Sequence, residues 1–225
     1  MDGKEIAARS AVAALRSGMI VGLGSGSTSL RAVEVIAGRM RAEGLSITGV
    51  PTSTATERAA RELGIPLATL DQQPQLDVAI DGADQVDAHL ACIKGYGGAL
   101  LREKIVARCA KRFLVMVDPS KVSEFLDKAV PVEVLPFAFG VACRHLVALG
   151  GRPRQRMATT GGGPYVTDNG NHIVDVEFGR IADPAALATR LAAIPGVADH
   201  GLFVGLVHEL HVGEPAGARV VRAPV

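Results

Sequence analysis

The chain has 225 residues, is 48% hydrophobic and carries a formal net charge of +1. It is long enough to bury a core in one large domain, or in one domain with a smaller companion. Its balanced charge, and an aromatic content of only 4%, argue against electrostatic attraction to nucleic acid or to an anionic membrane, and against a stacking platform for single strands.

The expected location is the cytoplasm. Cys92, Cys109 and Cys143 lie far apart without a C-x-x-C pair, which favours reduced thiols. The N-terminal segment MDGKEIAARSAVAAL contains acids and lacks the apolar stretch of a signal peptide. No apolar run approaches the length that spans a bilayer.

Strands and helices alternate in the first half of the chain. Helical spacing is predicted at 5–17, about 28–42, within PTSTATERAARELG up to Gly64, and over GALLREKIVARCAKR; strands are predicted at 19–24, 46–50, IPLATL, 76–80 and 113–118. This alternation is typical of parallel βαβ units. We therefore expect an α/β fold with a Rossmann-like, mostly parallel sheet.

The second half has a different pattern. VPVEVLPF is strand-like, AFGVACRHLVALGG is helical, YVTDNGNHIVDVEF has the Asn-Gly signal of a hairpin, and DPAALATRLAAIPG is helical. The order β-α-β-β-α predicts a smaller ferredoxin-like α+β domain at 130–200. Residues 1–129 and 201–225 then form the Rossmann-like catalytic domain, to which GLFVGLVHELHVG returns as a late strand.

Polar segments follow several predicted strands, and they locate the expected site. These segments are SGST (25–28), TST (52–54), DGAD (81–84) and DPSK (118–121). In open α/β sheets, ligands bind beyond the carboxyl ends of the strands. We therefore expect a binding site on that edge of the sheet.

The segment GLGSGST has the character of an anion site, because it follows a strand and opens a helix. Its glycine spacing does not match the dinucleotide fingerprint, and it lacks the Gly-Lys-Ser/Thr of a P-loop. A small phosphate, held by backbone N–H groups and by the hydroxyls of Ser25, Ser27 and Thr28, fits best. The alternative is a glycine-rich turn without a ligand.

Two acids in DGAD suggest either a polyol site or a metal site. Asp81 stands at a strand end and Asp84 in the following turn, and the alternative is an Asx-turn in which they bond their own backbone. No third metal ligand is evident. The segment HELH (208–211) does not match HExxH, and its alternation suits a strand.

The segment KGYGGALLREK combines a cation, a flexible loop and an acid. Its glycines allow close approach of the backbone to a ligand, and Lys94 supplies a positive charge. Glu103 has apolar helical neighbours, so burial would raise its pKa toward that of a general base. Alternatively, Glu103 reaches the surface or pairs with Arg102 or Lys104, and those two residues are solvated or structural. Lys121 is a further strand-end cation, or an ordinary surface lysine.

Taken together, GLGSGSTS, DGADQVD, KGYGGALLREK, DPSK, PVEVLP, GGRP, VTDNGN and IPGV…GLF resemble the type A ribose-5-phosphate isomerases. The resemblance covers nearly the whole chain. It implies a Rossmann-like domain with a smaller α+β domain, a homo-oligomer that is most often a dimer, and no metal or nucleotide cofactor. It also implies interconversion of ribose 5-phosphate and ribulose 5-phosphate in the non-oxidative pentose phosphate pathway.

The resemblance also assigns roles to residues. It implies that Glu103 is the general base of an enediolate mechanism, and that Asp81, Asp84 and Lys94 hold the sugar hydroxyls and carbonyl. The implied substrate-binding set is Ser25, Gly26, Ser27, Thr28, Asp81, Gly82, Ala83, Asp84, Lys94, Gly95, Tyr96, Gly97 and Lys121.

The chain departs from the family pattern at a few positions. Tyr96 stands where a third glycine is usual, Leu101 where a small or polar residue is usual, and Ser25 where threonine is common. Lys4 and Arg9 are candidates for the basic residue often found in the first helix.

Two other functions fit a fold of this kind. A sugar-phosphate-sensing module of a transcription regulator would need an attached helix-turn-helix, and no segment is spare to supply one. An amino-sugar phosphate deaminase would need a base on different loops, together with a histidine that the sequence does not place.

Overall fold

The structure is a computed structural model that describes residues 2–223. Residue 1 and residues 224–225, which belong to the expected Rossmann-like domain, lie outside the described residues. The contacts within the chain divide it into two units. Unit 1 comprises residues 1–83, 102–122 and 206–225, and unit 2 comprises residues 84–101 and 123–205.

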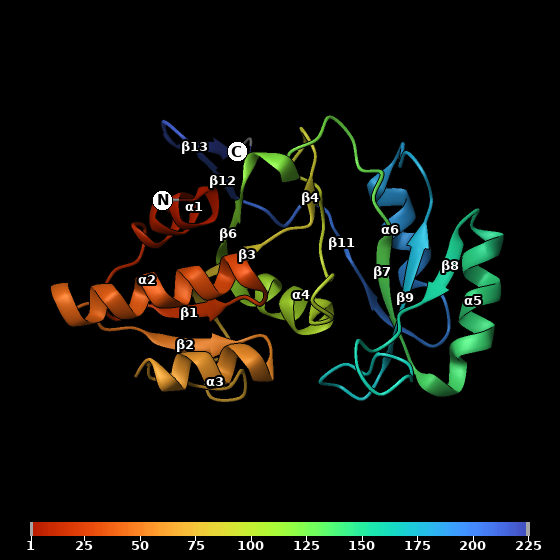
Figure 1. The fold of residues 1–225 in the computed structure, drawn as a ribbon, viewed down its shortest axis with the longest axis horizontal. Helices are drawn as coiled ribbons and strands as arrows, with labels where there is room; N and C mark the ends of the chain where they lie inside the picture. Colours follow the sequence, from red (N-terminus) through yellow and green to blue (C-terminus); the bar gives the residue numbers. More distant parts are fainter. Residues whose placement is uncertain (1, 224–225) are drawn as a thin grey trace. The chain divides into compact units, whose positions relative to one another are not determined.

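Unit 1 is built on a mostly parallel sheet (Figure 1). Its strands, in spatial order, are β13 (Gly217–Arg222), β12 (Glu209–Glu214), β6 (Ala110–Val117), β3 (Leu76–Gly82), β1 (Ile20–Leu23) and β2 (Thr48–Pro51). Only the pairing of β13 with β12 is antiparallel among those of the described residues. The later part of the predicted late strand 201–213 therefore lies in the first sheet as β12, beside β6. Its beginning does not, because Leu202–Phe203 pairs with Cys92–Ile93 of unit 2.

Helices cover the sheet of unit 1. They are α1 (Gly3–Val12), α2 (Ser27–Glu43), α3 (Thr54–Glu62) and α4 (Leu100–Cys109), with a short 3₁₀ turn at Pro119–Lys121. Buried residues of α1 and α2 pack with alternate residues of β1 and β3 in one core cluster. On β1, a Cβ atom at Gly22 would lie 2.4 Å from Val106 of α4, so the close approach of this helix requires glycine there.

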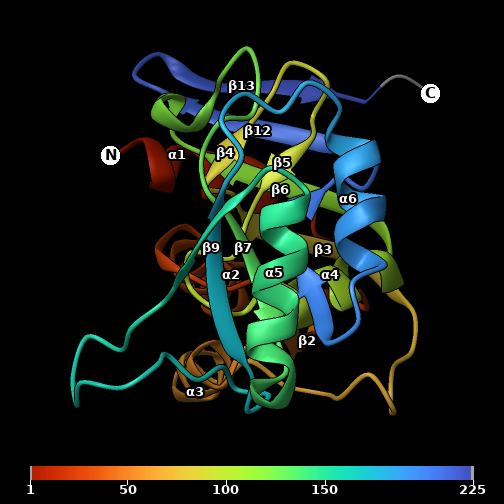
Figure 2. The same ribbon diagram turned by 90° about the vertical axis from the view of Figure 1, so that its right-hand side faces the viewer.

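Unit 2 contains an antiparallel sheet with the strand order β10-β7-β9-β8. Its elements in chain order are β7 (Val130–Val134), a 3₁₀ turn at Pro136–Ala138, α5 (Phe139–Ala148), β8 (Arg152–Gln155), β9 (His172–Glu177), α6 (Pro184–Ala192) and β10 (Val197–His200). Residues of α5 and α6 share one core with β7 and β9 (Figure 2). The β-α-β-β-α pattern is confirmed, and the predicted fold class with it.

A second, short sheet in unit 2 was not predicted. It joins β11 (Leu202–Phe203), β5 (Cys92–Ile93) and β4 (Gln85–Val86) in antiparallel fashion. Strands of two residues carry no detectable periodicity, so the sequence pattern could not reveal them. Residues 84–101, which contain β4 and β5, belong to unit 2.

Two strand predictions differ from the structure. IPLATL forms only a single bridge, between Leu67 and Gly49. The Asn-Gly turn forms, because Thr167 N–H donates to Asn171 O, but next to the turn β9 makes only a single bridge, between His172 and Val166. Most of β9 pairs with Arg152–Gln155 instead. The segment between Gln155 and the turn instead leaves the sheet as a long loop.

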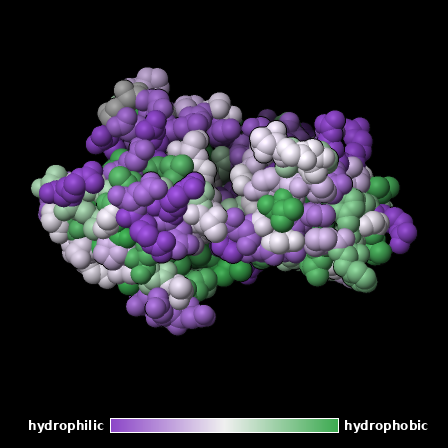
Figure 3. Space-filling model, turned by 60° about the horizontal axis from the view of Figure 1, so that its bottom comes forward, coloured by the Kyte–Doolittle hydropathy of each residue, from purple (hydrophilic) through white to green (hydrophobic). Residues whose placement is uncertain are grey.

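Within residues 2–223, no helix is both long enough and apolar enough to cross a membrane. On the face of the molecule in Figure 3, hydrophilic and hydrophobic side chains are interspersed.

Candidate active site

The candidate residues of unit 1 gather where the strand order of the main sheet reverses. Strand β1 lies between β2, which follows it in the chain, and β3. A crevice at the carboxyl ends of strands forms at such a switch point. The loop Ser25–Thr28 follows β1, and Asp81 is the next-to-last residue of β3. The two segments therefore lie at the same polar edge of the sheet, as the sequence predicts.

Asp81 organises this edge through one carboxylate oxygen. The side chain is 2% exposed, and Oδ1 accepts hydrogen bonds from the N–H groups of Ser25 (3.1 Å) and Gly82 (2.8 Å) and from the hydroxyl of Ser29 (2.7 Å). A Cβ atom at Gly24 would lie 2.1 Å from the same oxygen. The glycine before the loop is therefore required by contact with Asp81.

The hydroxyl of Ser25 joins a cluster of hydroxyl groups at the end of β2 and the start of α3. Ser25 Oγ lies 2.7 Å from Thr52 Oγ1, 2.8 Å from Ser53 Oγ and 3.3 Å from Thr56 Oγ1. Ser53 also caps α3 by accepting the N–H of Thr56. The predicted polar segment 52–54 thus helps to fix the loop after β1.

The remainder of that loop opens α2. Gly26 precedes the helix with φ 87°, and Gly26 and Ser27 are exposed while Thr28 is half-buried. Exposed N–H groups and the helix dipole at such a start favour an anion. Lys4 Nζ of α1 donates to Ser27 Oγ at 2.9 Å, whereas Arg9 pairs with Glu5 of its own helix. Of the two basic candidates, Lys4 is the one at the loop.

The segment DPSK follows β6, the neighbour of β3. Asp118 caps the 3₁₀ turn, since its Oδ1 accepts the N–H of Ser120 at 2.9 Å. Burial raises the pKa of Asp118, but the hydrogen bonds from Ser120 and the charges of Lys121 and Lys4 outweigh burial and hold it below its ordinary value. Lys121 is half-buried at the end of the turn.

Glu103 lies in the first turn of α4 and is 5% exposed. Its predicted helical neighbours Leu100, Val106 and Ala107 are buried as well. The prediction that Glu103 is buried is therefore confirmed, and the alternative in which it reaches the surface is wrong. Lys104 is 5% exposed, so of the two suggested roles the structural one holds and the solvated one does not.

The glycine loop after β5 belongs to unit 2 together with Asp84 and Lys94. Lys94 is 2% exposed, its N–H donates to Gly201 O, and its Nζ lies 5.2 Å from the centre of the Phe203 ring. Gly95 and Gly98 have φ values of 103° and 80°, which favour glycine. The loop conformation therefore depends on these two glycines.

Tyr96 fits this loop without backbone strain, because its φ angle is not positive. Its N–H donates to Asp84 Oδ2 at 3.0 Å and its hydroxyl to Ala129 O at 3.2 Å, and the residue is exposed. Partial burial of the phenol group, and after it the negative charge of Asp84, raises the pKa of Tyr96 to about 12. The hydroxyl thus stays protonated and able to donate.

Asp87 has a structural role. The side chain is 6% exposed, and its Oδ1 accepts the N–H groups of His89 and Ala91, both at 2.9 Å. These bonds close the turn between β4 and β5. In residues 2–223 no group of three or more His, Cys, Asp or Glu side chains is arranged to hold a metal ion.

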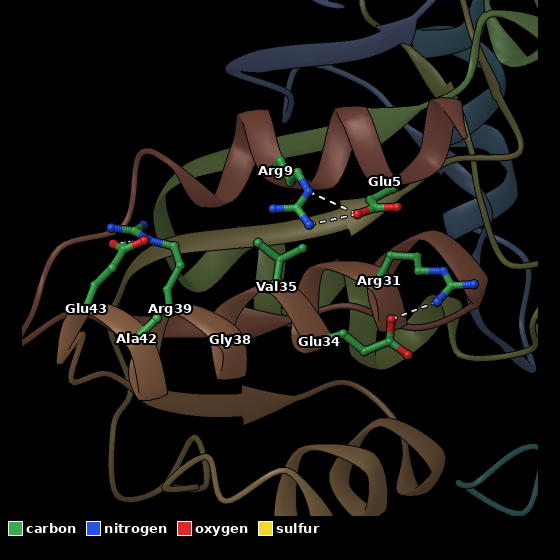
Figure 4. A pocket seen from close by; sticks show the side chains of 9 residues that line it. All are labelled: Glu5, Arg9, Arg31, Glu34, Val35, Gly38, Arg39, Ala42 and Glu43. Atoms are coloured by element: carbon green, nitrogen blue, oxygen red, sulfur yellow. Dashed lines mark hydrogen bonds and ion pairs between the residues drawn. The ribbon is translucent and has the colours of Figure 1, made fainter. Parts of the chain in front are cut away.

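A surface pocket between α1 and α2 is lined by paired charges (Figure 4). Its arginines each face a glutamate: Arg9 with Glu5, Arg31 with Glu34, and Arg39 with Glu43. The positive charge is thereby neutralised within the lining. This pocket is a poor site for an anion.

Two solved structures share the fold of this chain and show the class of protein to which it belongs. The chain shares its fold with a solved ribose 5-phosphate isomerase A from Methanocaldococcus jannaschii, at a TM-score of 0.94 and 39% identity over 97% of both chains. A second solved structure, a D-ribose-5-phosphate isomerase in complex with phospho-erythronic acid, has a TM-score of 0.95 and 38% identity over 99% of this chain and 100% of that one. The class is thus that of α/β sugar-phosphate isomerase folds.

The family follows from the sequence comparisons. The family model of ribose 5-phosphate isomerase A (phosphoriboisomerase A) matches residues 48–217. The ribose-5-phosphate isomerase A of Methanosarcina acetivorans is 52% identical, over 96% of this chain and 92% of that protein. That of a Roseiflexus species is 50% identical, over 98% and 96%. The chain belongs to the ribose 5-phosphate isomerase A family.

Proposed function

We propose that this enzyme interconverts D-ribose 5-phosphate and D-ribulose 5-phosphate through an enediolate, in the non-oxidative branch of the pentose phosphate pathway. Family membership supports the reaction. The observation that carries the mechanism is the burial of Glu103 in the first turn of α4. A carboxylate removed from water among apolar groups favours the proton-accepting role that isomerisation requires.

Glu103 is proposed to move the proton between C1 and C2. Proton removal from carbon beside a carbonyl develops negative charge on the oxygen, which a nearby cation stabilises. The buried ammonium group of Lys94 is suited to this role. Asp81 and Asp84 would hold the sugar hydroxyls and assist ring opening, since carboxylates accept hydroxyl hydrogen bonds.

The loop after β1 is proposed to bind the phosphate group. Ser27 and Thr28 begin α2, and Lys4 adds a positive charge beside Ser27. Anions bind at such helix starts. Lys121 supplies a further cation, and the rest of the proposed substrate set is Ser25, Gly26, Gly82, Ala83, Gly95, Tyr96 and Gly97.

Location, assembly and cofactor use are part of the same proposal. We propose a cytoplasmic homodimer that acts without a metal or nucleotide cofactor. Full activity after exhaustive EDTA treatment, and a molecular mass of two chains in solution, are the expected results. Loss of activity that added Mg²⁺ restores would contradict the cofactor-free reaction.

The mechanism is tested by Glu103→Gln, which keeps the size of the side chain but removes its basicity. We expect isomerisation to fall by roughly 10²–10⁴-fold while ribose 5-phosphate still binds, since general base catalysis contributes an effect of that size. Glu62→Gln, at an exposed position of α3, is the matched control. Near-normal turnover in Glu103→Gln would overturn the role of Glu103.

Solvent deuterium tests the reaction itself. The wild-type protein in D₂O should incorporate deuterium at the carbon that receives the proton, and Glu103→Gln should not. Phospho-erythronic acid, which is present in one solved relative, should compete with ribose 5-phosphate here. If the substrate is isomerised in D₂O and the product never contains deuterium, a hydride shift would be favoured over the enediolate.

A further inference from the structure

The carbonyl groups of the glycine loop in unit 2 are held from one side by residues far away in the sequence. Arg156 Nη1 donates to Gly95 O and to Tyr96 O, each at 3.0 Å, and the hydroxyl of Tyr165 donates to Gly97 O at 3.2 Å. Three successive carbonyls of the loop therefore have side-chain donors. Arg156 is 61 residues from Gly95 in the chain.

Arg156 is itself fixed in place by Asp175 of β9. Arg156 Nε donates to Asp175 Oδ2 at 2.9 Å, and Nη2 donates to Oδ1. The two side chains are only 15% and 27% exposed. A bidentate pair of this kind defines the plane of the guanidinium, so Nη1 is aimed at the loop.

The peptide bond between Gly95 and Tyr96 is held at both ends. Its carbonyl accepts from Arg156, and its N–H donates to Asp84 Oδ2. Because a trans peptide is planar, its C=O and N–H point in opposite directions and move together. A displacement at Arg156 is therefore transmitted through one peptide to the carboxylate of Asp84, and to the residue before the loop, Lys94.

Tyr165 completes the same arrangement. Its ring lies 5.9 Å from the Arg156 guanidinium, and its N–H donates to Arg156 O at 2.9 Å. A Cβ atom at Gly98 would lie 2.2 Å from the Tyr165 hydroxyl. The loop backbone and Tyr165 thus fit together closely.

We propose that Arg156, held by Asp175, is a positioning residue of the isomerase: it fixes the glycine loop so that Lys94 and Asp84 keep their catalytic geometry. The proposal rests on the proposed function. Arginine suits this role because its fork serves Asp175 and two carbonyls at once, which a lysine ammonium cannot do in the same geometry.

The strand pair of β8 and β9 offers a matched control. Arg152 of β8 pairs with Glu177 of β9 at 3.1 Å, and the two side chains are 81% and 60% exposed. Arg156 follows β8 directly, so Arg152→Ala removes the same charge from a nearby position without touching the loop. It should leave kcat/KM within about twofold of wild type and the melting temperature nearly unchanged.

The kinetic test compares Arg156→Ala and Arg156→Lys with that control. We expect Arg156→Ala to lower kcat/KM for ribose 5-phosphate by roughly a hundredfold, mostly through kcat, because displacement of catalytic groups by about 1 Å has effects of that size. The kcat/KM of Arg156→Lys should be less than tenfold higher than that of Arg156→Ala. Adding Asp175→Asn to Arg156→Ala should lower kcat/KM no further, since Asp175 acts through Arg156.

Amide hydrogen exchange separates loop positioning from general destabilisation. In Arg156→Ala the peptide covering residues 94–100 should exchange at least tenfold faster, while the core strands β7 and β9 keep their protection. Normal kcat/KM in Arg156→Ala, or lost activity with unchanged exchange in the loop, would overturn the proposal. If wild-type protein fails to isomerise ribose 5-phosphate, the proposed function fails, whereas the exchange result still tests the anchoring of the loop.

Discussion

The Oδ1 atom of Asp81 accepts the backbone N–H of Ser25 at 3.1 Å across 56 residues of sequence. This bond joins the loop after β1 to the end of β3. The hydroxyl of Ser29 and the N–H of Gly82 donate to the same atom. The loop that we propose for the phosphate and the acid that we propose for the sugar are therefore joined in one hydrogen-bonded cluster.

Gly24→Ala tests how closely this hydrogen-bonded cluster around Asp81 is packed. The added methyl group would lie 2.1 Å from Asp81 Oδ1, so Asp81 or the loop must move. We expect a loss of about 1–3 kcal/mol in the free energy of unfolding, as for other overpacked sites, and a strong loss of isomerase activity. Urea unfolding and steady-state kinetics measure the two effects.

Gly38→Ala is the matched control for that substitution. Gly38 lies within α2, and its added Cβ meets no atom within 4 Å. Alanine should stabilise this helix position by roughly 0.5–1 kcal/mol. If Gly24→Ala behaved like Gly38→Ala, the close contact with Asp81 would have no energetic importance.

Lys4→Met tests the cation beside the proposed phosphate loop. Lys4 donates to Ser27 at 2.9 Å from a different helix, so its charge lies next to the start of α2. We expect KM for ribose 5-phosphate to rise about tenfold, which corresponds to about 1.4 kcal/mol, with a smaller change in kcat. Arg9→Met, whose side chain pairs with Glu5, should leave KM nearly unchanged.

The location of the proposed site on the main sheet could be predicted from sequence, because periodic segments show where strands end. The polar loops at 25–28 and 81–84 follow directly from that pattern. The partners of those loops could not be predicted in the same way. Lys4 reaches Ser27, and Ser25 bonds Thr52, only through the folded arrangement of helices and strands.

Tyr96 shows a second limit of sequence reasoning. A glycine-rich segment suggests positive φ at each glycine, and a tyrosine within it looks incompatible. In the structure Gly95 and Gly98 have positive φ, and Tyr96 does not. Which residues of a turn need glycine depends on the hydrogen bonds that hold it, and Arg156, which lies far from the loop in the sequence, supplies two of these.

His211 should make the stability of the protein depend on pH. It is 3% exposed between α1 and the main sheet, with Ser10 Oγ at 2.8 Å from Nδ1. Burial lowers the pKa of His211 below 6.5, against the opposing charge of Glu209, while Arg112 and Arg222 lower it further. The unfolded chain therefore binds a proton at a higher pH than the folded chain does.

The sign of this effect follows from proton linkage. The contribution of neutral His211 is fully present above about pH 6.5 and declines as pH falls through 6.5 toward the lower folded pKa. Urea midpoints measured between about pH 7.5 and 5 should fall for wild type and fall less for His211→Asn. His89→Asn, at an exposed position, should retain the wild-type slope; equal slopes in all three proteins would contradict this role of His211.

Glu133 should hold the Asn-Gly turn of unit 2 to the sheet. It is 0% exposed on β7, and its Oε1 accepts hydrogen bonds from Thr167 Oγ1 (2.9 Å), Asn169 Nδ2 (3.0 Å) and Asn171 Nδ2 (2.9 Å). Its other oxygen, Oε2, is buried without a hydrogen-bond partner among the described residues. One oxygen of Glu133 is therefore the acceptor for all three donors.

Glu133→Gln and Glu133→Ala separate the acceptor from the charge. Glutamine keeps an oxygen at the Oε1 position and removes a desolvated charge, so we expect a change within about 1 kcal/mol. Alanine removes the acceptor from three donors and should destabilise the protein by about 2 kcal/mol or more, or roughly 4–8 °C in melting temperature for a chain of this size. Thermal unfolding measures the difference, and faster hydrogen exchange at 167–171 in the alanine variant would locate it; a larger loss in glutamine than in alanine would show that the charge itself stabilises the fold.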